Sequence, residues 1–211
     1  MSTDLSQTTF VIVDLETTGA SPKNGSAITE IGAIKVKTGQ VIDQFESFVN
    51  PLAPIPEYIT DLTGITNQML MNAPIIDEIF PKFLEFVGDH EDSVLVAHNA
   101  PFDLSFLKSA AKELDLIWPK YRTLDTVTIA RQVLSKEDVP NCKLGTLAEF
   151  FGTKVEPNHR ALDDAKATTE VLHGLIERLG SMDVTTIDSL LNFAKTAAHI
   201  QRKNYYGLSS T

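Results

Sequence analysis

The 211-residue sequence has little that would tie it to an oxidising compartment or a lipid bilayer. Cys142 is the only cysteine, which excludes a disulfide framework and a cysteine-based metal site. No apolar run reaches the roughly 18 residues that a membrane-spanning helix needs. Residues 1–9 are polar and contain no basic segment followed by an apolar stretch, so a secretory signal is not expected. These absences predict a cytoplasmic protein with no membrane partner.

Positive charge is also scarce, because 18 Lys and Arg face 28 Asp and Glu, a net charge of −10. Residues 181–211 sum to +1, so residues 1–180 carry −11. A domain that binds nucleic acid by phosphate neutralisation alone is basic, and the composition by itself argues against that partner. The exception is an acidic site that holds divalent cations and contacts phosphate through them.

Hydrophobic patterning predicts a mixed α/β fold. Strands are expected at residues 9–14, 27–37, 40–49 and 93–97, with a hairpin turn at 37–40. Helices are expected at residues 74–88 with a kink or break at Pro81, and at 101–114, 124–134, 144–151 and 162–179. Hairpin strands followed by alternating strands and helices indicate a mixed sheet with helices on its faces.

The expected domain covers residues 1–180. Residues 181–211 are interpreted as a C-terminal helix over 188–203 and an unstructured end, which would serve as a linker or a partner-docking segment. No G-x-G-x-x-G or G-x-x-x-x-G-K-[ST] follows any expected strand. This absence excludes a small-molecule α/β enzyme that uses a nucleotide cofactor.

Three acidic clusters in the sequence are candidates for catalytic or metal-binding residues, and the first is Asp14-Leu15-Glu16. Carboxylates at i and i+2 at the end of a strand point to the same face. Like charges this close repel one another unless a cation or a proton intervenes, and carboxylate oxygens suit Mg²⁺ and Mn²⁺. Taken alone, the same pattern also fits a solvated strand end.

The other two clusters are residues 98–103 (HNAPFD) and 159–164 (HRALDD). Asp103 falls in the first turn of a helix, where it either complements the helix dipole or faces a ligand at the carboxyl edge of the sheet. His159 and Asp164 are five residues apart, which an i, i+4 salt bridge explains poorly. A loop histidine with a nearby carboxylate is typical of a general base.

The order D-x-E, H-N-x-x-F-D and H-x-x-x-x-D resembles the DEDD exonuclease superfamily, and the histidine spacing resembles its DEDDh 3′–5′ branch. The chain is similar over about residues 9–179 to the epsilon proofreading subunit of bacterial DNA polymerase III and its relatives. Residues 17–19 (TTG), 62–66 (LTGIT) and 160–165 (RALDDA) belong to the same resemblance. It implies an RNase H-like fold, a mixed five-stranded sheet flanked by helices.

The resemblance also implies a set of site residues. Two divalent cations, Mg²⁺ or Mn²⁺, would carry out two-metal hydrolysis of a phosphodiester. The implied metal residues are Asp14, Glu16, Asp103 and Asp164, with Asp103 acting through water and His159 taking the proton of the attacking water. The implied contacts with the terminal nucleotide are Leu15, Thr17, Thr18, Leu62, Asn99 and Phe102. Two such cations would explain how an acidic protein handles a polyanion.

The function implied is a metal-dependent 3′–5′ exonuclease that acts on single-stranded or frayed DNA ends in proofreading or repair and releases nucleoside 5′-monophosphates. One alternative is a 3′–5′ exoribonuclease of the same branch, similar to RNase T or oligoribonuclease. The motifs leave these two open, because recognition of the terminal 2′-OH separates them. A further alternative is a docking module that residues 181–211 attach to a DNA polymerase subunit or a fused domain.

Overall fold

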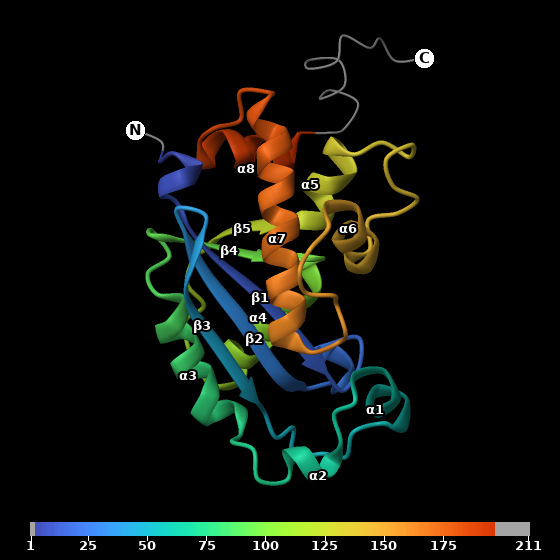
Figure 1. The fold of residues 1–211 in the computed structure, drawn as a ribbon. Coiled ribbons are helices and arrows are strands. Elements are labelled where there is room, and N and C mark those ends of the chain that lie inside the picture. Colours follow the sequence, from blue (N-terminus) through green and yellow to red (C-terminus); the bar gives the residue numbers. More distant parts are fainter. Residues whose placement is uncertain (1–2, 197–211) are drawn as a thin grey trace.

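A computed structural model describes residues 3–196 of the chain, which fold around one mixed sheet (Figure 1). The sheet has five strands in the order β3-β2-β1-β4-β5. The strands are β1 (Thr9–Thr17), β2 (Ile28–Lys37), β3 (Gln40–Phe48), β4 (Ser93–Ala97) and β5 (Arg122–Asp125). β2 pairs antiparallel with β1 and β3, whereas β4 pairs parallel with β1 and β5. The expected mixed five-stranded sheet is confirmed.

Helices cover both faces of this sheet (Figure 1). The helices are α1 (Glu57–Thr63), α2 (Asn67–Leu70), α3 (Ile76–Val87), α4 (Ala100–Glu113), α5 (Thr126–Val133), α6 (Leu144–Phe151), α7 (Ala161–Gly180) and α8 (Ile187–Lys195), with short 3-10 turns at Leu5–Gln7 and Pro22–Asn24. One face packs against α3 and α4, and the other against α5, α6, α7 and α8. No helix among the described residues is both long and apolar enough to cross a bilayer.

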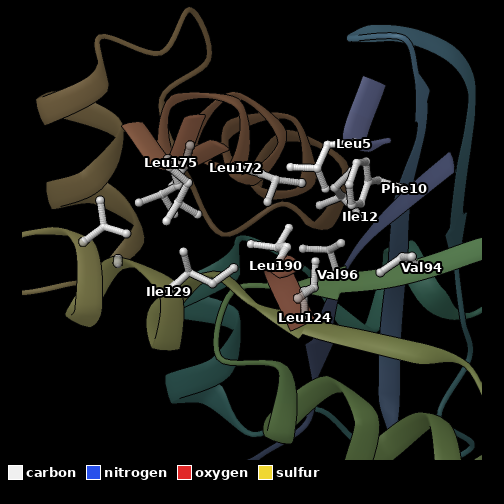
Figure 2. Packing of buried hydrophobic residues seen from close by; sticks show 14 of the residues in the cluster. Leu5, Phe10, Ile12, Val94, Val96, Leu124, Ile129, Leu172, Leu175 and Leu190 are labelled. Carbon is white, nitrogen blue, oxygen red and sulfur yellow. The ribbon is translucent and has the colours of Figure 1, made fainter. Parts of the chain in front are cut away.

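Alternation along β1 divides its side chains between two cores. Phe10 and Ile12 pack under α7, in the cluster that Figure 2 shows with Leu172 and Leu175. Val11 and Val13 point to the opposite face and pack against α3 and α4. This period of two is the pattern of a strand that is buried on both faces.

The hairpin between β2 and β3 lies where the sequence predicts it. Lys37 pairs with Gln40, and the two residues between them, Thr38 and Gly39, have φ of 52° and 73°. Positive φ at both central positions is the type I′ geometry that matches the twist of paired strands.

Several expected element bounds were wrong. β1 continues to Thr17, so Asp14 and Glu16 lie within the paired strand, opposite Gly32 and Glu30. The residues expected to begin a helix at 124 instead end β5, and α5 starts at Thr126. α3 runs through Pro81 as one helix, with that proline on its exposed side.

The described part of the C-terminal segment packs on the domain. Val184, Leu190 and Phe193 are buried in the same core as α7. The N–H of Ile187 donates to the carbonyl of Thr3 at 2.9 Å. α8 ends at Lys195, because Thr196 is extended, so the helix expected over 188–203 stops earlier. Residues 197–211, the rest of the expected attachment segment, lie outside the described residues, and a domain boundary at 180 stays a prediction.

Candidate active site

The side chains on the face of β1 that packs against α7 change from apolar to acidic toward the carboxyl end of the strand. Phe10 and Ile12 give way to Asp14 and Glu16 on the same face. A cavity of about 370 Å³ opens there. It is lined by Asp14, Leu15, Glu16, Thr17, Gly19, Ala20, Tyr58, Ile59, Leu62, Thr63, Phe102, His159 and Asp164. Three of the four predicted metal residues and the predicted base therefore share one cavity.

Glu16, His159 and Asp164 form a group that is able to hold a metal ion. One ligand atom from each residue lies within 4.8 Å of the other two. Glu16 and Asp164 are 8% and 7% exposed, whereas His159 is exposed. Carboxylate oxygens are the donors that Mg²⁺ and Mn²⁺ prefer, so the donor chemistry fits these cations.

Asp14 and Asp103 complete a cluster of four carboxylates. Asp14 is half-buried on β1, and Asp103, in the first turn of α4, is 2% exposed and lies outside the cavity lining. Burial raises the pKa of the Asp14 carboxyl, and the charges of Asp103, Asp164 and Glu16 raise it further. Burial also raises the pKa of Asp103. Hydrogen bonds from the backbone N–H groups of Asp103 and Leu15 lower this pKa, but burial has the larger effect. The four acids are therefore electrostatically one site.

The cluster is costly to ionise without a counter-charge. Burial raises the pKa of Glu16 to about 8, and the charges of Asp164 and Glu30 act in the same direction, while Arg160 lowers it. Burial likewise raises the pKa of Asp164. Divalent cations would resolve this repulsion, which is the electrostatic reason to expect metal here.

Asn158 organises the loop that carries His159 and Asp164. Its N–H donates to Oδ1 of Asp164 at 2.9 Å, and its Nδ2 donates to Oδ2 of Asp163 at 3.1 Å. Its Oδ1 accepts the N–H of Arg160 at 3.1 Å. Asn158 was not among the predicted site residues, although an asparagine just before a helix start is a recognisable capping signal.

Asp125 organises the start of α4 in a similar way. Its Oδ1 accepts the N–H groups of Asn99 at 2.9 Å and Ala100 at 3.3 Å, and also that of Val127 at 3.1 Å. One carboxylate at the end of β5 thus holds the N-termini of α4 and α5 together. Asp103 follows in the first turn of α4, close enough for its charge to raise the pKa of Asp14.

The predicted nucleotide-binding residues divide into two groups. Leu15, Thr17, Leu62 and Phe102 line the cavity, although the Leu15 side chain is 4% exposed and sits in the core. The Thr17 hydroxyl donates to the carbonyl of Gly19 at 2.7 Å.

Thr18 and Asn99 are absent from that lining. The Thr18 hydroxyl oxygen accepts the N–H of Ala27 at 2.9 Å, which closes the loop between β1 and β2. Asn99 is exposed with φ of 69° and precedes the first turn of α4.

Tyr58 is a cavity residue that the sequence analysis missed. It lies one turn before Leu62 on α1, and the two are 63% and 52% exposed, while Ile59 and Thr63 of the same helix are buried. Large apolar surfaces at i and i+4 on the open side of a short helix were the available signal. Together they form an apolar rim over the carboxylates.

A family model described as an exonuclease, RNase T, matches residues 11–172. The chain belongs to this exonuclease family. The RNase T exonuclease match spans all three acidic clusters, and it confirms the resemblance and the expectation of a nuclease enzyme.

Curated relatives agree with this assignment. The chain is 49% identical over 203 residues to the "Putative bifunctional exonuclease/endonuclease protein MT2247" of Mycobacterium tuberculosis (strain CDC 1551 / Oshkosh), covering 94% of this chain. It is 49% identical over 185 residues to a PolC-type DNA polymerase III of Caldanaerobacter subterraneus subsp. tengcongensis, covering 86% of this chain. The chain spans only 31% and 13% of the lengths of these relatives.

The fold is similar to the nuclease domain of 3′hExo, described as a DEDDh family member bound to rAMP. The TM-score is 0.67 at 19% identity, over 82% of this chain and 94% of the other. This likeness bears on the fold, which is that of the DEDDh exonucleases.

Proposed function

We propose that this exonuclease domain is a metal-dependent 3′–5′ exonuclease that hydrolyses single-stranded or frayed DNA ends to nucleoside 5′-monophosphates. The observation that carries the proposal is the meeting of Glu16, His159 and Asp164, with ligand atoms within 4.8 Å of one another. They meet in a cavity that Asp14 also lines.

The residues present fit two divalent cations. Asp14, Glu16 and Asp164 would hold the ions directly, and the more deeply buried Asp103 would act through water. When bound, Mg²⁺ or Mn²⁺ supplies charge neutralisation and polarisation at the phosphate, which four carboxylates and a phosphodiester could not provide themselves. Because carboxylate oxygens suit both ions, the donor set supports either.

His159 would take a proton from the attacking water. It is the exposed member of the three-residue group, so a proton that it accepts passes on to solvent. The water oxygen forms a bond to phosphorus as the bond to the 3′ oxygen of the preceding nucleotide breaks. The terminal nucleotide leaves as a 5′-monophosphate, and the shortened strand keeps a 3′-OH.

The apolar rim formed by Tyr58 and Leu62, together with Phe102, would hold the terminal nucleotide. Stacking on such side chains tolerates any base, as an exonuclease without sequence preference requires. Leu15 and Thr17 would contact the terminal sugar through the cavity wall. Thr18 and Asn99 would act indirectly, by fixing the backbone on either side of the cavity.

The similarity to PolC-type DNA polymerase III supports DNA as the substrate and proofreading or repair, in the cytoplasm, as the cellular use. It also supports a DNA polymerase as the partner, either a separate subunit or a fused domain, for which residues 181–211 were the expected attachment. The exoribonuclease alternative is supported by the similarity in fold to the 3′hExo nuclease domain, which is described as bound to rAMP.

The test compares two 5′-labelled single strands of identical sequence, one DNA and one RNA, each with Mg²⁺, with Mn²⁺ and with chelator. We expect a metal-dependent ladder that shortens from the 3′ end, formed faster on DNA. A faster ladder on RNA would favour the exoribonuclease. No ladder on either strand would contradict the proposal.

A further inference from the structure

A fifth carboxylate, Glu30, lies beside the cluster and is completely buried, at 0% exposure. It is on β2, directly opposite Glu16 in the antiparallel ladder. A buried carboxylate needs a partner, because an unpaired charge away from water is strongly unfavourable. Its position raises the question of whether it is a further metal ligand.

Both oxygens of Glu30 are already engaged. Oε1 accepts from Nη2 of Arg160 at 2.7 Å and from Nε at 3.2 Å. Oε2 accepts from the same Nε at 3.2 Å and from the N–H of Ala161 at 3.0 Å. This bidentate contact fixes the orientation of the Arg160 guanidinium as well as its distance from the Glu30 carboxylate. Glu30 therefore does not share the role of the four cavity carboxylates.

These contacts hold the start of α7 on β2. Arg160 is the N-cap residue of α7, and its side chain makes no cap hydrogen bond. Glu30 instead supplies an acceptor and a negative charge at the helix N-terminus, from a different element. The guanidinium also lies over the Phe48 ring, at 5.1 Å from its centroid, which further limits its movement.

We propose that Glu30 and Arg160 form a positioning pair that sets His159 and Asp164 against Asp14 and Glu16. The inference rests on the proposed metal-dependent function. His159 directly precedes the anchored Arg160, and Asp164 lies in the first turn that follows it. A shift of the Glu30–Arg160 contact would move His159 and Asp164 together. Asp14 and Glu16 would stay in place, because β1 carries them.

The test measures Mn²⁺ binding by titration calorimetry, alongside hydrolysis of a labelled DNA strand. Glu30→Gln is expected to weaken Mn²⁺ affinity about 10- to 100-fold, as loss of the groups that orient metal ligands does. KM for the strand at saturating metal is expected to stay unchanged, because the apolar rim lies on other elements. A general loss of structure would instead raise KM and lower the melting temperature together.

Glu46→Gln is the matched control, because Glu46 is the outer, 49%-exposed partner of the same arginine, at 3.9 Å. We expect it to bind Mn²⁺ as the wild-type protein does. Arg160→Lys covers the case in which Glu30→Gln does not fold. Lysine keeps the charge but loses the bidentate contact, so it should weaken Mn²⁺ affinity in the same direction.

Wild-type Mn²⁺ affinity in a folded Glu30→Gln or Arg160→Lys variant would overturn the inference and leave the proposed function standing. Wild-type protein that neither binds Mn²⁺ nor shortens a strand would overturn both.

Discussion

Gly32 of β2 lies directly against Ala161, the first residue of α7. A Cβ atom on Gly32 would overlap the backbone of Ala161 and Leu162. Gly32 pairs with Asp14 in the β1–β2 ladder, so this contact sets how closely α7 approaches the carboxylates. The absence of a side chain at Gly32 leaves the space that the start of α7 occupies.

Gly32→Ala is expected to destabilise the fold by about 1–3 kcal/mol, the usual range for overpacking a buried site. It should also weaken Mn²⁺ binding, because α7 carries Asp164. Urea unfolding and Mn²⁺ titration measure the two effects. Gly145→Ala on α6 is the control, since a Cβ there has nothing within 4 Å, and helix propensity predicts a small gain in stability. Equal stability of Gly32→Ala and wild type would refute the close contact.

Metal-free protein should lose stability as pH rises from about 4.5 to about 8. Burial raises the pKa of Glu16 from the usual 4.5 of a free glutamate to about 8, so the folded state holds a proton that the unfolded chain has released. The free energy of unfolding therefore falls across this window, by on the order of 4 kcal/mol from Glu16. Asp14 and Asp103, whose pKa values are also raised, act in the same direction.

Thermal melting with chelator at several pH values measures this loss of stability. Glu16→Gln should make the melting temperature depend less on pH. Mn²⁺ should raise the melting temperature more at pH 8 than at pH 6, because protons and metal compete for the same oxygens. A melting temperature that rises with pH in chelator would argue against the shared carboxylate cluster.

His159→Gln should lower the hydrolysis rate about 10²- to 10⁴-fold, the range for loss of a general base. The rate at saturating Mn²⁺, compared with Mn²⁺ affinity from calorimetry, separates the two roles that the geometry allows. A variant that loses metal binding in proportion to its rate would make His159 a ligand and not the base.

Tyr58→Ala and Leu62→Ala should each raise KM for a DNA strand about tenfold, because stacking of a base on an aromatic ring is worth about 1–3 kcal/mol and burial of a leucine against a base contributes a similar amount. Both side chains are exposed, so the melting temperature should not change. Ile117→Ala is the control, because this 92%-exposed residue lies outside the cavity lining. Unchanged KM in both rim variants would mean that the strand does not cross this rim.

Local patterns identified the long elements and misjudged the short ones. β5 has four residues, of which only Leu124 is buried, so alternation carried too little signal and the following helix pattern was extended into it. α1 and α2 follow the prolines at 51, 54 and 56, in a stretch where the hydrophobic pattern predicted no helix. Pro81 was expected to kink or break α3, but the helix continues through it as one element, with the proline in the helix interior on its exposed side.

The candidate catalytic residues were easier to predict than the residues that position them. Asp14, Glu16, His159 and Asp164 stand in recognisable spacings, and the fold brings them to one cavity. Glu30 sits in an ordinary strand, 130 residues before Arg160, and nothing local marks it as the partner of that arginine. Such long-range pairs follow from strand register and helix placement, which the sequence pattern does not specify.

The most direct test compares two adjacent carboxylates, Asp164 and Asp163. Asp164 is buried and faces Glu16 and His159, whereas Asp163 points outward to Lys166 at 3.1 Å. The measurement is the rate at which a 5′-labelled DNA strand shortens from its 3′ end in Mg²⁺, for Asp164→Asn and Asp163→Asn beside wild type. We predict that Asp164→Asn loses at least about 10²-fold in rate, while Asp163→Asn stays close to wild type. Equal rates in the two variants, or no shortening by the wild-type protein, would contradict the account.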